Sequence, residues 1–247
     1  MSTNKELLRF NNLTLGYDCH PAVHHLDYTI DSGALIAVVG PNGSGKSTLL
    51  KGIVGDLIPL EGEIIFNAIK PSEIAYLPQQ ANIDKSFPIS VFDMVAMGLW
   101  NQTGAFNKFS TDHNAQVYDA LDKVGLSGFE SRPINTLSGG QMQRTLFARQ
   151  LLQDAPLILL DEPFKAIDVS TINDLLKLIK NWNKSGKTIV SVLHDIDQVK
   201  QHFPQTLLLS RELIAAGKTQ VALTAENLEK ANNLTESFND EAAICAK

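Results

Sequence analysis

A glycine-rich segment near the start of the chain has the composition and spacing of a phosphate-binding loop. Residues 40–48 read GPNGSGKST and match the pattern G-x-x-x-x-G-K-[ST]. The segment follows the apolar run Leu35–Val39 and leads into the helical pattern Thr48–Ile53, which is a strand–loop–helix context. Glycines let backbone N–H groups turn toward phosphate oxygens, and the helix start adds the positive end of its dipole. The expected nucleotide contacts are Gly40, Asn42, Gly43, Ser44, Gly45, Lys46, Ser47 and Thr48.

A second group of chemically active side chains follows a later apolar run. Leu157–Leu160 is expected to be a buried strand that delivers Asp161 to its C-terminal end, where open α/β sheets bind ligands. Asp161 is expected to hold Mg²⁺ together with Ser47, and Glu162 is positioned to polarise or deprotonate an attacking water. Taken alone, Asp-Glu-Pro after a strand also fits a solvated turn. The phosphate loop upstream favours the metal and general-base interpretation.

A third motif, Leu137-Ser138-Gly139-Gly140-Gln141, has the form of a helix start. Ser138 followed three residues later by Gln141 is a capping box. The two glycines beside the cap would let the phosphate of another molecule approach the helix N-terminus closely. A capping box by itself is a common feature of helix starts and indicates no function. This motif therefore points to a function only in combination with the other two.

The elements that must position these residues alternate between strands and helices, as is typical of an α/β fold with a largely parallel sheet. Continuous apolar runs at 35–39, 157–160 and Thr188–Leu193 suit strands buried on both faces. Ile172–Trp182 repeats apolar residues at helical spacing. His194 ends the strand Thr188–Leu193, so we expect it at the same sheet edge as Asp161 and the phosphate loop.

The rest of the chain indicates an N-terminal antiparallel β portion and a helical insertion. Leu7–Leu15 and Leu26–Ile30 are strand-like and are separated by a polar link that contains histidines. Helical patterns then occupy Val91–Met97, His113–Val124 and Gln141–Leu152. We expect a single domain with an α/β core over 1–88 and 153–230, a helical subdomain over 89–152 and a polar tail over 231–247.

Composition argues against several classes of protein. The formal charge is −6, and no stripe of Lys and Arg is visible, so nucleic acid is not expected as a partner. The two cysteines, Cys19 and Cys245, lie near opposite ends and offer no disulfide framework. No secretory signal and no apolar run of membrane-spanning length is present, so we expect a cytoplasmic protein whose membrane work is done by a partner chain.

Together the three motifs resemble those of the ATP-binding cassette (ABC) ATPases, over nearly the whole chain. Residues 40–48 resemble the family's Walker A loop, 157–162 its Walker B strand and 137–141 its signature motif. The resemblance implies a phosphate-loop NTPase core of RecA-like fold, with ATP and Mg²⁺ as ligands. It adds four residues: Tyr17 stacking on adenine, Gln79 sensing Mg²⁺ and the γ-phosphate, Asp168 contacting an opposing subunit, and His194 as the switch histidine. Gln80 is adjacent, and spacing favours Gln79.

The family pattern also implies partners. Two such subunits pair head to tail, so that Ser138, Gly139, Gly140 and Gln141 of one close over the ATP of the other. A single cassette without a fused membrane span resembles importer subunits that dock on separate permeases, here near Phe87–Trp100. A resemblance to the zinc and manganese importers, with zinc slightly ahead, is carried by Phe87–Gly98, by Glu162-Pro163-Phe164, and by the runs Leu207–Gly217 and Leu223–Leu228. An extracytoplasmic metal-binding protein and a location on the inner face of the plasma membrane are implied as well.

Two features depart from the pattern or compete with it. Lys165-Ala166-Ile167 stands before Asp168 where smaller residues are expected, which leaves the local contacts open. Cys19, His20, His24 and His25 suggest a metal site, but adjacent histidines face opposite sides of a strand and Cys19-His20-Pro21 reads as a turn, so structural roles are favoured.

A soluble ABC-type assembly factor, for instance in iron–sulfur cluster assembly, shares every catalytic motif and remains the alternative function. A nucleic-acid-associated ATPase is disfavoured by the net negative charge.

Overall fold

Two compact units make up the part of the chain that the structure describes. The computed structural model describes residues 5–18, 20–67, 69–79, 88–104, 109–165 and 167–237. The first unit consists of Met1–Tyr76, Pro156–Glu162 and Asn183–Lys247, and the second of Leu77–Ala155 and Pro163–Trp182. The chain therefore leaves the first unit and returns to it twice.

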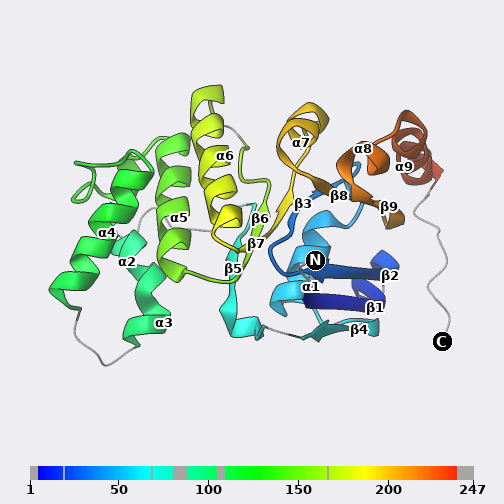
Figure 1. The fold of residues 1–247 in the computed structure, drawn as a ribbon, viewed down its shortest axis with the longest axis horizontal. Coiled ribbons are helices and arrows are strands. Elements are labelled where there is room, and N and C mark those ends of the chain that lie inside the picture. The colour runs from blue at the N-terminus through cyan, green and yellow to red at the C-terminus, as the bar shows by residue number, and fades with distance from the viewer. Residues whose placement is uncertain are drawn as a thin grey trace. The chain divides into compact units, whose positions relative to one another are not determined.

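The first unit begins with a three-stranded antiparallel sheet in the order β2-β1-β4 (Figure 1). Its strands are β1 (Glu6–Tyr17), β2 (His20–Asp31) and β4 (Glu61–Phe66). The predicted N-terminal strands lie inside β1 and β2. The predicted polar link between them is wrong, because β2 begins at His20 and its pairing with β1 extends to Tyr17 opposite His20.

The second sheet of this unit has six strands in the order β5-β6-β7-β3-β8-β9. The strands are β3 (Leu35–Val39), β5 (Ile74–Leu77), β6 (Leu157–Asp161), β7 (Thr188–Val192), β8 (Gln205–Ser210) and β9 (Glu212–Lys218). Neighbours β6 and β7, β7 and β3, and β3 and β8 run parallel, whereas β9 is antiparallel to β8. The predicted α/β fold with a mostly parallel sheet is confirmed.

Burial explains why the three apolar runs form the centre of this sheet. Every residue of β3, β6 and β7 is buried. Helix α1 (Lys46–Val54) packs its apolar face, including Leu49 and Leu50, into the same core as Leu15 of β1. A β-carbon at Gly52 would lie 2.5 Å from Leu15 Cδ1, so the helix and β1 approach closely.

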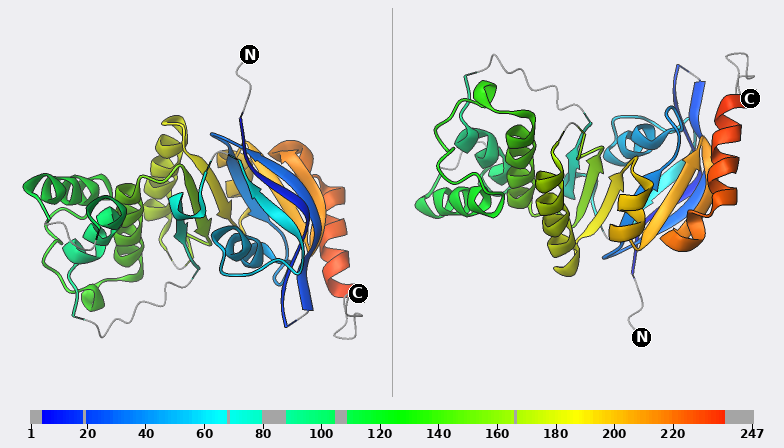
Figure 2. Two further views of the ribbon diagram at one scale, coloured as in Figure 1. Left: turned by 90° about the horizontal axis from the view of Figure 1, so that it is seen from below. Right: turned by 90° about the horizontal axis from the view of Figure 1, so that it is seen from above.

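The first unit also contains the 3-10 helix η1 (Pro71–Glu73) and the helices α7 (Ile196–His202), α8 (Thr219–Ala222) and α9 (Ala225–Ser237). Helix α9 contacts β8 and β9 and is the red-orange helix beside them in Figure 2. Ala231 of α9 is buried, and its carbonyl accepts a hydrogen bond from Ser210 Oγ at 2.7 Å. Residues 231–237, expected as part of a polar tail, are therefore helical, and residues 238–247 lie outside the described part.

The second unit is built of helices, with α2, α4 and α5 packed together (Figure 1). Its elements are α2 (Val91–Ala96), the 3-10 helix η2 (Met97–Leu99), α3 (Trp100–Thr103), α4 (Thr111–Lys123), the 3-10 helix η3 (Ile134–Thr136), α5 (Gly139–Gln153) and most of α6 (Val169–Lys184).

The predicted helices are confirmed, and their starts explain the shifted boundaries. Ser90, Ser110 and Ser138 each cap a helix by accepting the N–H of the third residue after them. The caps place the starts of α4 and α5 about two residues before the first residue of each predicted pattern. Phe147 of α5 stacks on Trp182 of α6, with ring centroids 5.7 Å apart, so these two helices are in apolar contact.

Candidate nucleotide site

The predicted phosphate loop lies where β3 ends and α1 begins, both in the first unit. Gly45 is the N-cap of α1 with φ 91°, a backbone conformation that favours glycine. A β-carbon there would lie 2.4 Å from the carbonyl oxygen of Ala22, and one at Gly40 would lie 2.0 Å from that of Leu209. The loop therefore needs glycine at both positions, because β2 and β8 approach its backbone so closely.

Backbone hydrogen bonds hold the loop from outside. Arg211 N donates to Ser44 O at 3.1 Å, and His24 N donates to Arg211 O at 2.7 Å. The turn between β8 and β9 thus joins the loop to β2. These contacts fix the loop's shape through main-chain atoms, whose positions do not depend on side-chain rotamers.

Lys46 is buried within the loop that it ends. Its Nζ donates to Gly40 O at 2.9 Å and to Pro41 O at 2.6 Å. Burial lowers the pKa of Lys46, and the charges of Glu162 and Asp161 oppose that shift. The amine is therefore a desolvated cation close to two carboxylates, and an anionic phosphate would compensate its charge.

Two of the predicted metal ligands, Ser47 and Asp161, are in contact across two elements. Ser47 Oγ at the start of α1 donates to Asp161 Oδ1 at the end of β6, at 3.0 Å. Burial raises the pKa of Asp161, and the Ser47 hydrogen bond opposes that shift. A hydroxyl and a buried carboxylate are hard oxygen ligands, so this donor set fits Mg²⁺.

Glu162 and His194 form a pair at the ends of adjacent parallel strands. Glu162 Oε1 lies 2.6 Å from His194 Nε2. Glu162 adopts φ 48°, uncommon for a residue with a side chain, while its N–H donates to Val192 O at 3.2 Å. The predicted convergence of His194 on the edge that carries Asp161 is confirmed, because β7 follows β6 in the sheet.

The adenine-stacking candidate, Tyr17, is at the end of β1 and is 46% exposed. Its hydroxyl accepts from Lys51 Nζ at 3.1 Å, and this amine lies 5.6 Å from the centre of the ring. The residue is thus exposed at the surface of the first unit. Gln79 is exposed in the second unit, and Gln80 lies outside the described residues, so the preference between them stays a prediction.

The signature motif, residues 137–141, and Asp168 belong to the second unit, where Gly140 lies close to Asp168. The capping box is formed: Gln141 N donates to Ser138 Oγ at 3.3 Å, and Ser138 N donates to Gln141 Oε1 at 3.0 Å. A β-carbon on Gly140 would be 3.7 Å from Asp168 Oδ2. Asp168 accepts the N–H of Thr171 at 2.9 Å and the Ser170 hydroxyl, and these bonds hold its pKa below the usual range.

Two residues near the site carried no sequence signal. Tyr76 on β5, which neighbours β6, is close enough to Asp161 that burial and this charge raise its pKa. Lys51, which contacts Tyr17, is one turn beyond the phosphate loop on α1. Each is a single residue in a short element, so no spacing pattern could have identified it.

The histidine segment at the start of β2 has structural partners. His25 Nδ1 lies 2.9 Å from Asn12 Oδ1, and burial lowers the pKa of His24. Among residues 5–237, with their gaps, no three His, Cys, Asp or Glu side chains are grouped to hold a metal ion. Cys19 lies outside the described residues. Within the same ranges, no helix is long and apolar enough to cross a membrane.

A glycine-rich loop after a central strand, with two carboxylates at the end of a nearby parallel strand, defines a phosphate-loop nucleotide hydrolase. The ABC transporter family matches residues 23–165, more than half of the chain. The chain belongs to this family and is an ABC-type ATPase.

Known relatives extend the match over most of the sequence. The chain is 40% identical over 227 residues to the manganese transport system ATP-binding protein MntB of Listeria monocytogenes, covering 90% of this chain and 94% of the relative. It is 39% identical over 236 residues to the zinc transport system ATP-binding protein TroB of Treponema pallidum, covering 94% and 88%. A dimeric ATP-binding cassette solved in a post-hydrolysis state with ADP and Pi superposes with a TM-score of 0.77 at 28% identity, covering 86% and 99%.

Proposed function

We propose that this chain is the ATP-hydrolysing subunit of a membrane importer for divalent transition-metal ions, zinc or manganese. The observation that carries the proposal is the identity of 39–40% to a manganese and a zinc transport ATPase over nearly the full length of all three proteins. The first unit supplies nucleotide binding and hydrolysis, and partner chains supply the path for the metal.

The first unit would hold ATP and Mg²⁺, and its two proposed metal ligands, Ser47 and Asp161, are already in contact. Lys46 is a desolvated cation for the β- and γ-phosphates, and Tyr17 offers its exposed ring to adenine. Ser47 and Asp161 would hold Mg²⁺, which supplies neutralisation of phosphate charge when bound. Gln79 is the proposed sensor of the metal and the γ-phosphate.

Hydrolysis would use the pair formed by Glu162 and His194. The Glu162 carboxylate accepts a proton from the attacking water, and His194 orients this carboxylate from 2.6 Å. Glu162 follows Asp161 directly, so the general base and the metal ligand are fixed at one strand end. The backbone bond from Glu162 N to Val192 O supports this geometry.

We propose that a second copy of the chain completes the site. Ser138–Gln141 and Asp168 would reach the ATP bound by the partner, in a head-to-tail dimer. Their grouping in the second unit and the dimeric state of the ADP-bound relative support this arrangement. Closure would follow ATP binding, and hydrolysis would relax it.

The membrane partner is proposed to dock near Phe87–Trp100. Phe87 lies outside the described residues. Met97 and Trp100 in this segment are 43% and 62% exposed, which is high for large apolar side chains. The chain would then be peripheral on the inner face of the plasma membrane, with an extracytoplasmic metal-binding protein delivering the ion.

The test is uptake of radioactive zinc and manganese in cells that lack the chain and are complemented with variants. The wild-type gene should restore uptake of one metal. Glu162→Gln, which removes the general base, should lower uptake by about 100-fold or more. Glu63→Gln makes the same chemical change at an exposed glutamate of β4 and should restore uptake fully. Metal uptake that is the same with and without the wild-type chain would favour the soluble assembly-factor function.

A further inference from the structure

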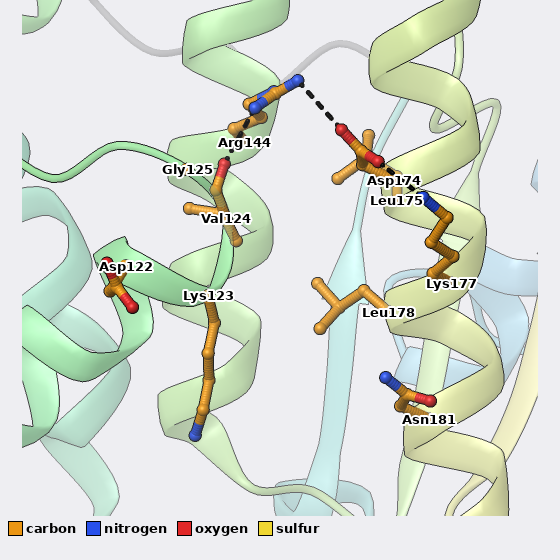
Figure 3. Close-up of a pocket in the computed structure, with 10 residues that line it drawn as sticks. All are labelled: Asp122, Lys123, Val124, Gly125, Arg144, Asp174, Leu175, Lys177, Leu178 and Asn181. Atoms are coloured by element: carbon orange, nitrogen blue, oxygen red, sulfur yellow. Dashed lines mark hydrogen bonds and ion pairs between the residues drawn. The ribbon is translucent and has the colours of Figure 1, made fainter.

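Arg144, five residues after the start of α5, links three elements of the second unit. Its Nη1 donates to the carbonyl of Val124 at the end of α4, at 3.1 Å, and its Nη2 lies 3.6 Å from Asp174 Oδ2 on α6. Figure 3 shows the guanidinium spanning the space between α5 and α6, with Lys177 pairing to Asp174 from the far side. The same Nη2 donates to Thr171 Oγ1 at 3.0 Å. The Arg144 guanidinium on α5 therefore contacts two side chains of α6, Thr171 and Asp174.

The Thr171 hydroxyl extends this link to Asp168. It is buried, accepts from Arg144, and donates to Asp168 Oδ2 at 2.8 Å. A hydroxyl has one proton to donate and two lone pairs to accept with, so it can serve both partners at once. The result is a continuous chain of hydrogen bonds from the helix that begins at the signature motif to the exposed carboxylate of Asp168.

We propose that Arg144 and Thr171 are positioning residues for the contact made with the partner's ATP. The inference rests on the proposed head-to-tail pairing. They fix the distance between two surfaces of one chain, the start of α5 at Ser138–Gln141 and the carboxylate of Asp168, so that both meet the partner together. Groups held in their bound arrangement before association lose less conformational entropy when the dimer forms.

Local contacts alone would fix Asp168 less well relative to α5. The Ser170 hydroxyl and the Thr171 N–H bind Asp168 to the start of its own helix, α6. Between Gly140 and Asp168 there is room for ordinary van der Waals contact, because a β-carbon added to Gly140 would lie 3.7 Å from Oδ2. The hydrogen-bonded connection from α5 to Asp168 runs through Arg144 and Thr171. Thr171 Oγ1 takes part in both of its hydrogen bonds, the one from Arg144 and the one to Asp168.

The experiment measures ATP-induced dimerisation by analytical ultracentrifugation in a Glu162→Gln background, where bound ATP persists. Thr171→Val keeps the side chain's shape but removes the hydroxyl, and it should raise the dimer dissociation constant about tenfold, which corresponds to about 1.4 kcal/mol. Thr171→Ser keeps the hydroxyl and should restore dimerisation to within about twofold of the parent. ATP affinity of the monomer should not change, because the phosphate loop is in the first unit.

Thr103→Val is the matched control, since it removes another buried hydroxyl of the second unit, one that donates to Leu99 O within its own helical turn. This control should dimerise like the parent. Equal dimerisation of Thr171→Val and the parent would overturn the inference, as would an equal loss in Thr103→Val or a failure of Thr171→Ser to rescue. If the Glu162→Gln parent binds ATP but stays monomeric, the proposed pairing itself fails, and this outcome is distinct from the others.

Discussion

At the scale of single residues, the pair of Glu162 and His194 is the feature most directly open to test. His194 lies 2.6 Å from the Glu162 carboxylate and is 44% exposed, while Glu162 is 12% exposed. Removing the imidazole would leave the carboxylate without this partner while the phosphate loop stays intact. We expect His194→Gln to lower kcat for ATP hydrolysis by about 100-fold, with little change in KM for ATP.

Steady-state hydrolysis and equilibrium ATP binding together check this expectation. His25→Gln is a suitable control because His25 also bonds a side-chain oxygen, but that oxygen is Asn12 Oδ1 on β1 and not a carboxylate at the end of β6. It should keep full activity. A His194→Gln enzyme with normal kcat would show that hydrolysis does not depend on orientation of Glu162 by His194.

Residue identity in the phosphate site could be predicted from spacing, but side-chain contacts could not. Lys46, Ser47, Asp161 and Glu162 are identified by motifs because their chemistry demands those residue types in order. The bond from Ser47 to Asp161 spans 114 residues in sequence and depends on which strands are neighbours. Sequence patterns describe one element at a time, so they carry no distance between elements.

At the scale of elements, the two ends of α1 allow a matched comparison. Gly45 before the helix and Gly55 after it both adopt positive φ, 91° and 84°. A β-carbon at Gly45 would be 2.4 Å from Ala22 O, whereas at Gly55 nothing lies within 4 Å. We expect Gly55→Ala to lower the free energy of unfolding by about 1–2 kcal/mol for backbone strain, and Gly45→Ala by about 1–3 kcal/mol more for the collision.

Urea denaturation without nucleotide measures this difference directly. Gly45→Ala should in addition bind ATP more weakly, because the loop must shift to relieve the collision with β2. Equal destabilisation of the two variants would mean that β2 yields at Ala22 without cost, and that the loop is not held by the close approach of β2.

Elements with continuous apolar runs or periodic apolar residues are predictable from the sequence, and elements without such a pattern are not. β3, β6 and β7 are buried along their full length, and their apolar runs predict them. β4 is exposed over its first half and intermediate over the rest, so its sequence EGEIIF has no strand period to detect. Helix α9 gives no sequence signal for the same reason. Its segment is polar, and its buried residue Ala231 is too small to mark an apolar face.

At the scale of the whole molecule, the division into two units separates binding from pairing. The residues proposed to hold ATP belong to the first unit, with the exception of Gln79, which is in the second. The residues proposed to reach the partner's ATP all belong to the second unit. In the proposed function, the chain must also couple the closing and opening of the dimer to a permease. A surface for that purpose should be apolar, exposed and dispensable for folding.

Trp100 is apolar and exposed, and its replacement tests the docking proposal. It is 62% exposed on α3, so Trp100→Ala should leave the unfolding temperature and the ATPase rate of the isolated protein almost unchanged. Buried aromatic anchors at interfaces commonly contribute about 2 kcal/mol or more, so recovery of a multi-span permease with the tagged chain from solubilised membranes should fall by about tenfold or more. Val221→Ala on α8 removes an apolar side chain that is 64% exposed in the first unit, and permease recovery should be retained. If Trp100→Ala recovers the permease as well as the wild-type chain does, Trp100 is not part of the docking surface, and the ATPase assignment stands.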